Sequence, residues 1–281
     1  MTISHSPDAL HGRLRLGPAE AAIFETFVVP RYMSLFGDLA IEMMAESPDA
    51  QVVHVHCRTG YPDRGILTKL PGAYVVGMDA SPAAIELARA KAAAMPDMVS
   101  QYRLVDEFPA PLPSSAFSHA LTLHALGEPD DRSEILTECT RLLAPNGQVL
   151  MAMPTRGSFQ ELADLLREYA LKYDEEGVGQ AVEQAGMSRP SMEVLGVELE
   201  EAGFDFVDLA LRPTTLRFQN GRDFFEDPIA RLVILPELRL ELGSENRERA
   251  LSYVRDAIDK YWSDGNFELT LNVGCATGRK V

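Results

Sequence analysis

Short apolar runs alternate with amphipathic stretches along residues 51–153. Runs rich in Val, Leu and Met predict strands at 51–56, 73–78, 99–104, 117–123 and 148–153. Between these runs, apolar residues at helical spacing predict helices over 62–70, 82–95 and 131–143. Strands that alternate with helices at these lengths predict an α/β fold with a doubly wound, mostly parallel sheet.

The regions on either side of this core are predicted to be richer in helix. Residues 1–19 are expected to be a flexible N-terminus, and residues 20–46 one or two helices broken near Pro30. After residue 153, helices are predicted at 158–173 and 191–202, an irregular segment at 174–190, extended runs at 204–211 and 214–218, helix-rich sequence at 222–262 and a last strand at 267–273. We expect one domain over 20–281, in which 158–202 and 222–262 are helical insertions.

Composition narrows the classes of protein that the chain can be. The 281 residues are 46% hydrophobic, which is enough for one large core, and no apolar run is long enough to predict a membrane span or a signal peptide. The three cysteines show no CxxC spacing, so a reducing, cytoplasmic setting is expected. A net charge of −16 would repel a phosphate backbone, which argues against nucleic acid as a partner.

Residues 51–60 carry the most chemical information. They read Gln-Val-Val-His-Val-His-Cys-Arg-Thr-Gly, an apolar strand that runs into a short turn. A predicted helix and a second strand follow, and that strand ends in Asp79. An acid about twenty residues past such a turn is where a βαβ unit meets a ribose hydroxyl.

This segment resembles the first motif of class I S-adenosylmethionine (SAM)-dependent methyltransferases, acid-x-Gly-x-Gly-x-Gly. The resemblance is also specific at 76–82, Val-Gly-Met-Asp-Ala-Ser-Pro, and at 136–150, and it covers roughly 20–281. It implies a seven-stranded sheet with an antiparallel last strand, and insertions that cover the substrate pocket. It also implies SAM as the cofactor.

The four motif positions read His54, His56, Arg58 and Gly60, so only the last glycine is retained. His54 cannot supply a full negative charge, whereas His56 and Arg58 fill space where the backbone must approach a ligand. Arg58 also places a cation beside a cationic cofactor. We expect SAM binding to be weak or lost, since even one unpaired buried polar group costs about 1–3 kcal/mol. The alternative is a loop that has re-formed and still holds the cofactor.

Two further positions match the family better. Asp79 matches the ribose-binding acid, although an acid that ends a strand and caps the next helix is also ordinary. Asp106 lies where the family often places a residue near the adenine amine, and a solvated loop acid is the alternative. The predicted cofactor site therefore comprises His54, His56, Arg58, Gly60, Asp79 and Asp106. The sequence identifies no catalytic residue.

Two other patterns carry less weight. His54, His56 and His124 could bring three imidazoles together, but without a carboxylate or Cys partner no metal site is predicted. Residues 272–278, Asn-Val-Gly-Cys-Ala-Thr-Gly, imitate a SAM loop better than residues 54–60 do. We interpret them as the end of the last strand, because no helix can follow to present its N-terminus to a ligand.

Three functions remain open from the sequence. The favoured one is a methyltransferase-fold protein with an eroded SAM site that does not catalyse and acts by binding another protein of unknown identity. The alternative is an active SAM-dependent methyltransferase on a small molecule or a protein side chain. The third is a protein that binds another ligand, with Arg58 meeting a phosphate or carboxylate. We further expect His54, His56 and Arg58 to face solvent or to pair with acids, Asp79 being the first candidate for Arg58 or His56.

Overall fold

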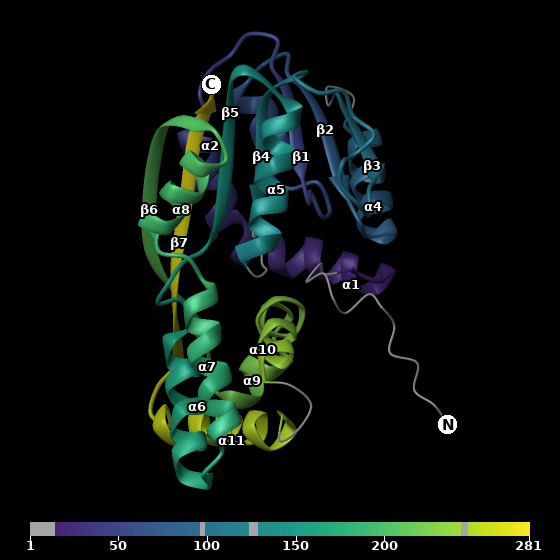
Figure 1. Ribbon diagram of the computed structural model, residues 1–281. Helices are drawn as coiled ribbons and strands as arrows, with labels where there is room; N and C mark the ends of the chain where they lie inside the picture. The colour runs from purple at the N-terminus through teal and green to yellow at the C-terminus, as the bar shows by residue number, and fades with distance from the viewer. Residues whose placement is uncertain (1–14, 96–98, 124–128, 243–246) are drawn as a thin grey trace, which may run out of the picture.

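The computed structural model describes residues 15–95, 99–123, 129–242 and 247–281, and a seven-stranded sheet forms its centre (Figure 1). The strands lie in the order β3-β2-β1-β4-β5-β7-β6. Their bounds are β1 Gln51–Val55, β2 Tyr74–Asp79, β3 Ser100–Leu104, β4 Phe117–Leu123, β5 Leu143–Pro154, β6 Phe204–Phe218 and β7 Phe267–Lys280. Strands β1 to β5 pair in parallel, and β7 is antiparallel to both β5 and β6. The predicted fold class is confirmed.

Strand β1 is buried on both faces, as expected for a central strand of a parallel sheet. Val53 and Val55 belong to one apolar cluster, and Val52 belongs to another on the opposite face. His54 alternates with these valines and therefore shares the face of Val52. This register sends the turn after β1 to the carboxyl edge of the sheet, where open α/β folds hold their ligands.

Helices cover the two faces of the sheet. On the face of Val52 lie α1 Pro18–Ile23, the π-helical stretch η2 Phe24–Met33, α2 Ser34–Met43, α3 Asp63–Lys69 and α4 Pro82–Ala93. On the other face lie α5 Pro129–Leu142 and α8 Met192–Glu201. The start of α4 follows the predicted rule, since the Ser81 hydroxyl accepts a hydrogen bond from the Ala84 amide at 3.3 Å and proline is the first helical residue.

The remaining helices gather at one end of the long β6–β7 hairpin and form a helical lobe (Figure 1). They are α6 Gln160–Tyr173, α7 Glu176–Ser188, α9 Gly221–Glu226, the π-helical η3 Ala230–Ile234, α10 Leu235–Glu241 and α11 Arg247–Tyr261. The prediction of an irregular segment at 174–190 was wrong, because α7 occupies most of it and buries Val178, Val182 and Ala185 at helical spacing.

The closing hairpin is also longer than predicted. Strand β6 does not break between residues 211 and 214, because its pairing with β7 continues through Arg212 and Pro213. Strand β7 continues to Lys280 and contains the whole of 272–278. The interpretation of that segment as strand rather than as a ligand loop is confirmed.

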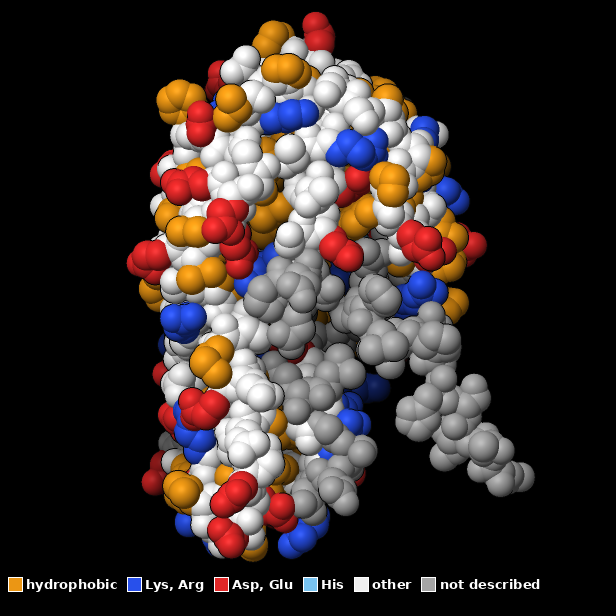
Figure 2. Space-filling model, viewed as in Figure 1, with side chains coloured by type: hydrophobic (Ala, Val, Ile, Leu, Met, Phe, Trp, Pro, Cys, Tyr) orange, Lys and Arg blue, Asp and Glu red, His pale blue; other side chains and the backbone are white. Residues whose placement is uncertain are grey.

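The surface matches the acidic composition. Figure 2 shows Asp and Glu side chains interspersed with Lys and Arg over the visible face, with apolar side chains between them. Within the described ranges, none of the helices has both the length and the apolar content that a membrane span requires.

Candidate cofactor site

The turn after β1 rests on a chain of three buried polar side chains. His54 is the second-last residue of β1, and its Nδ1 lies 2.7 Å from Oδ1 of Asp63, the first residue of α3. The other carboxylate oxygen of Asp63 accepts a hydrogen bond from the Tyr102 hydroxyl at 2.8 Å. Because a carboxylate can only accept, Nδ1 carries a proton, and in the neutral ring Nε2 is then an acceptor. His54 and Asp63 are 1% and 0% exposed, so the pair is sealed from bulk water.

Tyr102 also explains why a glycine is retained at position 60. A Cβ on Gly60 would lie 2.9 Å from the Tyr102 hydroxyl, and Gly60 has a φ of +80°. A Cβ on Gly77 in β2 would lie only 2.5 Å from the same ring. Burial, and after it the charge of Asp63, raises the pKa of Tyr102, so the hydroxyl stays a donor. The internal packing of Tyr102 is therefore sufficient to require Gly60.

Asp79 is engaged by the chain itself. Its Oδ2 accepts the Arg58 amide at 3.0 Å, and its Oδ1 accepts the Ser81 amide at 2.8 Å. The Arg58 guanidinium lies 4.0 Å from the same Oδ2, and its side chain is 11% exposed. The predicted pairing of Asp79 with Arg58 is confirmed.

His56 and Arg58 adopt backbone angles that favour glycine. Their φ values are +55° and +51°. The His56 ring stacks on Phe108, which follows β3, with centroids 6.0 Å apart. Because β2 lies between β1 and β3, this stack spans the carboxyl end of β2, where Asp79 lies. The sequence did not predict this contact.

The start of the described chain lies along the same edge. Arg15 donates to Asp106 at 3.4 Å, and the Leu16 carbonyl accepts a hydrogen bond from the Ser81 hydroxyl at 2.9 Å. Asp106, predicted to lie near an adenine amine, thus has an ion-pair partner from the N-terminal segment. These contacts hold residues 15 and 16 beside the ends of β2 and β3.

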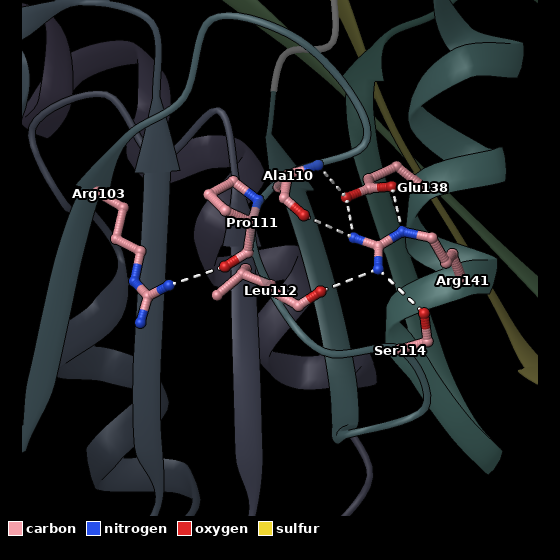
Figure 3. Close-up of polar contacts among 7 residues, drawn as sticks. All are labelled: Arg103, Ala110, Pro111, Leu112, Ser114, Glu138 and Arg141. Atoms are coloured by element: carbon pink, nitrogen blue, oxygen red, sulfur yellow. Dashed lines mark hydrogen bonds and ion pairs between the residues drawn. The ribbon is translucent and has the colours of Figure 1, made fainter.

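The loop after β3 is fixed by two side chains of α5 (Figure 3). The Arg141 guanidinium donates to the carbonyls of Ala110 and Leu112 at 3.1 and 2.9 Å. It also forms a short ion pair with Glu138 at 2.6 Å. Glu138 in turn accepts the Ala110 amide at 2.9 Å. Since the backbone of the loop is held at several points, the position of Phe108 over the site is structurally determined.

Comparison with known proteins agrees with this architecture. Residues 53–151 match a family model described as a methyltransferase domain. Similar solved structures include a putative methyltransferase from Bacillus halodurans, with 17% identity, a TM-score of 0.55, and coverage of 87% of this chain and 98% of that one. The chain has the class I methyltransferase fold.

Two further structures with this methyltransferase fold are informative. Phosphoethanolamine N-methyltransferase 2 of Haemonchus contortus, in complex with SAM, has 15% identity, a TM-score of 0.57, and coverage of 94% of this chain and 57% of that one. The complex between the Haloferax volcanii Trm112 methyltransferase activator and a putative methyltransferase gives 17% identity, a TM-score of 0.51, and coverage of 94% and 97%. No curated protein matches the chain in sequence.

In this methyltransferase fold the predicted site residues all lie at the carboxyl edge of β1, β2 and β3 or in the loops that follow. Sequence reasoning missed Asp63, Tyr102 and Phe108. The only signal for Asp63 was an acid at the start of the helix after the turn. His124 lies outside the described residues, and no group of three or more potential metal ligands occurs within them.

Proposed function

We propose that this methyltransferase-fold protein binds SAM weakly or not at all, does not catalyse methyl transfer, and acts by binding another protein. The observation that carries the proposal is that the protein's own side chains lie across the carboxyl edge of β1, β2 and β3. This is the edge where a cofactor would bind, and we call it the cofactor edge. Arg58 pairs with the ribose-type acid Asp79, and His56 stacks on Phe108 above the end of β2.

The charges at this edge support the first half of the proposal. SAM carries a positive sulfonium and a positive ammonium, and Arg58 adds a third cation where the cofactor's ribose would meet Asp79. Displacing a hydrogen bond to a charged group costs about 1.5–3 kcal/mol. Two such losses would weaken binding by about 10²–10⁴-fold.

One observation favours the alternative, an active SAM-dependent methyltransferase. Asp63 holds His54 in the tautomer whose Nε2 is an acceptor, and this buried Nε2 has no hydrogen-bond partner among the described residues. An ammonium group could donate to it as it would to the family's acid. The buried carboxylate of Asp63 would then stabilise the positive charge from behind.

Calorimetric titration of the purified protein with SAM, and with its demethylated product S-adenosylhomocysteine, separates the two functions. The proposal predicts no saturable heat below about 1 mM of either ligand, which corresponds to binding weaker than about −4 kcal/mol. Low-micromolar binding of either ligand would establish the alternative.

Exposed apolar side chains support the second half of the proposal. Phe206 is 86% exposed, and Leu211 and Val197 are each 50% exposed, on β6 and the neighbouring α8. Exposed apolar side chains on two neighbouring elements would suit a surface that binds another protein. The Haloferax neighbour, solved with an activator protein, is consistent with protein binding by this fold.

The cysteines bear on where such binding would take place. Cys57, Cys139 and Cys275 all carry free, buried thiols. Free thiols are usual in reducing compartments, which supports a cytoplasmic setting.

A further inference from the structure

A cavity lies in the helical lobe, away from the turn after β1. It has a volume of about 440 Å³ and is lined by residues of α6, α7, the η3–α10 segment and the turn that precedes α6. Figure 1 shows these helices gathered in the helical lobe. That volume is within the range of small-molecule sites. Its wall is largely apolar and includes Leu162, Leu166, Val182, Ile234, Leu238 and Leu242.

Three arginines and one glutamate supply the charge of the cavity lining, and most of this charge is already paired. Arg167 forms ion pairs with Asp164 at 2.8 Å and Glu183 at 2.7 Å. Arg189 forms one with Glu237 at 2.9 Å. Arg189 also lies over the Phe159 ring, 5.1 Å from its centroid, so its guanidinium is held at the wall.

Arg156 is different. It lines the cavity and is exposed, and it forms no ion pair with an acid of the described residues. The pKa of the exposed Glu193 carboxyl is lowered, first by a hydrogen bond with Ser191 and then by one with the backbone. The positive charge of Arg156 contributes a smaller part of this lowering. The cavity therefore combines an apolar wall with one positive charge that is not neutralised by an ion pair.

We propose that this cavity binds a small amphipathic anion, with the simplest example a free medium-chain carboxylate. The alkyl chain would lie against the leucines of α6 and α10, and the carboxylate would lie at Arg156 and Arg189. A polyphosphate or nucleotide would bring more negative charge than Arg156 can balance against an apolar wall, and a cation would be repelled by that arginine. The proposal goes beyond the proposed function, because it needs neither SAM nor a protein partner.

Decanoate and its neutral counterpart 1-decanol test the proposal by calorimetry on the full chain. Saturable one-to-one binding of decanoate is expected. Arg156→Gln should weaken decanoate binding about 10-fold, since a charged hydrogen bond of about 1.5 kcal/mol is lost, and should leave 1-decanol binding unchanged. Arg255→Gln, which removes an exposed arginine from α11, is the matched control and should change neither.

Ala181→Phe tests the cavity itself. Ala181 lines it from α7, and a phenyl ring there would fill space that the alkyl chain needs, so binding of both ligands should be lost. Retained far-UV circular dichroism would show that this variant folds. If it does not fold, Arg156→Gln alone tests the proposal, because Arg156 is exposed and its replacement should not affect folding. No saturable decanoate binding, or equal weakening of both ligands by Arg156→Gln, would overturn the proposal. A parallel SAM titration reports on the other site, so failure here and failure of the proposed function are distinguishable.

Discussion

Asp63 has two roles at the cofactor edge, because its one carboxylate fixes both the imidazole of His54, near the end of β1, and the tyrosine that packs against Gly60. Nδ1 of His54 and the hydroxyl of Tyr102 each donate a hydrogen bond to this carboxylate, at 2.7 and 2.8 Å. All three groups lie where water cannot replace a lost partner. The conformation of the turn therefore depends on a residue outside the motif.

Asp63→Ala should destabilise the protein by about 2–6 kcal/mol, about 1–3 for each of the two buried polar groups that it leaves unpaired. Urea denaturation measures the change as a lower midpoint with little change in slope. Glu86→Ala removes an exposed carboxylate from α4 and is the control, expected within about 0.5 kcal/mol of wild type. Equal midpoints for the two variants would show that the buried chain contributes nothing.

His119 provides a pH-dependent prediction. Burial lowers its pKa, the hydrogen bond to the Ala45 carbonyl opposes this, and the charge of Arg279 adds to the lowering. Because the folded pKa lies below the unfolded value of about 6.5, the unfolded chain takes up a proton first as pH falls. Stability should therefore decline from about pH 6.5 downward toward the folded pKa.

His119→Gln should reduce this decline between pH 7.5 and 5.5. The measurement is the urea midpoint of wild type and variant at both pH values. The variant is expected to be less stable at pH 7.5, since Gln fits the site of the ring poorly, and to lose less stability on acidification. If the urea midpoint of the variant falls as much between pH 7.5 and 5.5 as that of wild type, His119 is not the group responsible for the decline.

At the scale of elements, the clamp on the loop after β3 links α5 to the site. Glu138→Ala should release the Ala110 amide and leave the Arg141 guanidinium with one partner fewer. Faster amide exchange across residues 106–114, measured by mass spectrometry, is the expected result. Glu134→Ala, an exposed change on the same helix, should leave that exchange unaltered. If both variants exchange alike, Glu138 does not hold the loop.

The elements that the sequence predicted well are those whose own residues determine them. Strand β1 needed only its valines, and α4 only the Ser81 cap and the proline after it. Helix α7 was missed because its apolar positions are few and interrupted by glycines. Strand β6 was predicted in two pieces because its continuity comes from pairing with β7, which no local pattern contains.

The candidate site divides in the same way. The positions of His54, Asp79 and Gly60 followed from strand ends and turn spacing. The stack of His56 on Phe108 could not be predicted, because it depends on the order β3-β2-β1 and on a loop held by another helix. Contacts between loops that are distant in sequence require the sheet order first.

In the whole molecule, polar contacts between distant segments tie the helical lobe to the sheet. Arg132 of α5 is 3% exposed and donates a hydrogen bond to the carbonyl of Ser188, the last residue of α7, at 3.2 Å. Arg31 in η2 pairs with Asp227, after α9, at 2.8 Å. The cofactor edge and the helical lobe are therefore held by the same N-terminal helices, which cover one face of the sheet.

The net charge of −16 sets the electrostatic context of both sites. An acidic molecule should attract a cationic cofactor and repel a carboxylate at long range. The local cations Arg58 and Arg156 act against this field in the two places where a ligand is in question. Ligand choice at each site thus depends on local side chains more than on the overall charge.

The SAM affinities of wild type and of the double variant His56→Gly/Arg58→Gly show whether these two side chains block the cofactor edge. His54 is kept, because an aspartate there would meet the carboxylate of Asp63. Asn146→Gly, which also replaces a residue of positive φ, controls for the backbone change. The account predicts no measurable binding by wild type or control, and SAM binding at least about 100-fold tighter in the double variant. Low-micromolar binding by wild type, or no gain in the double variant, would contradict it.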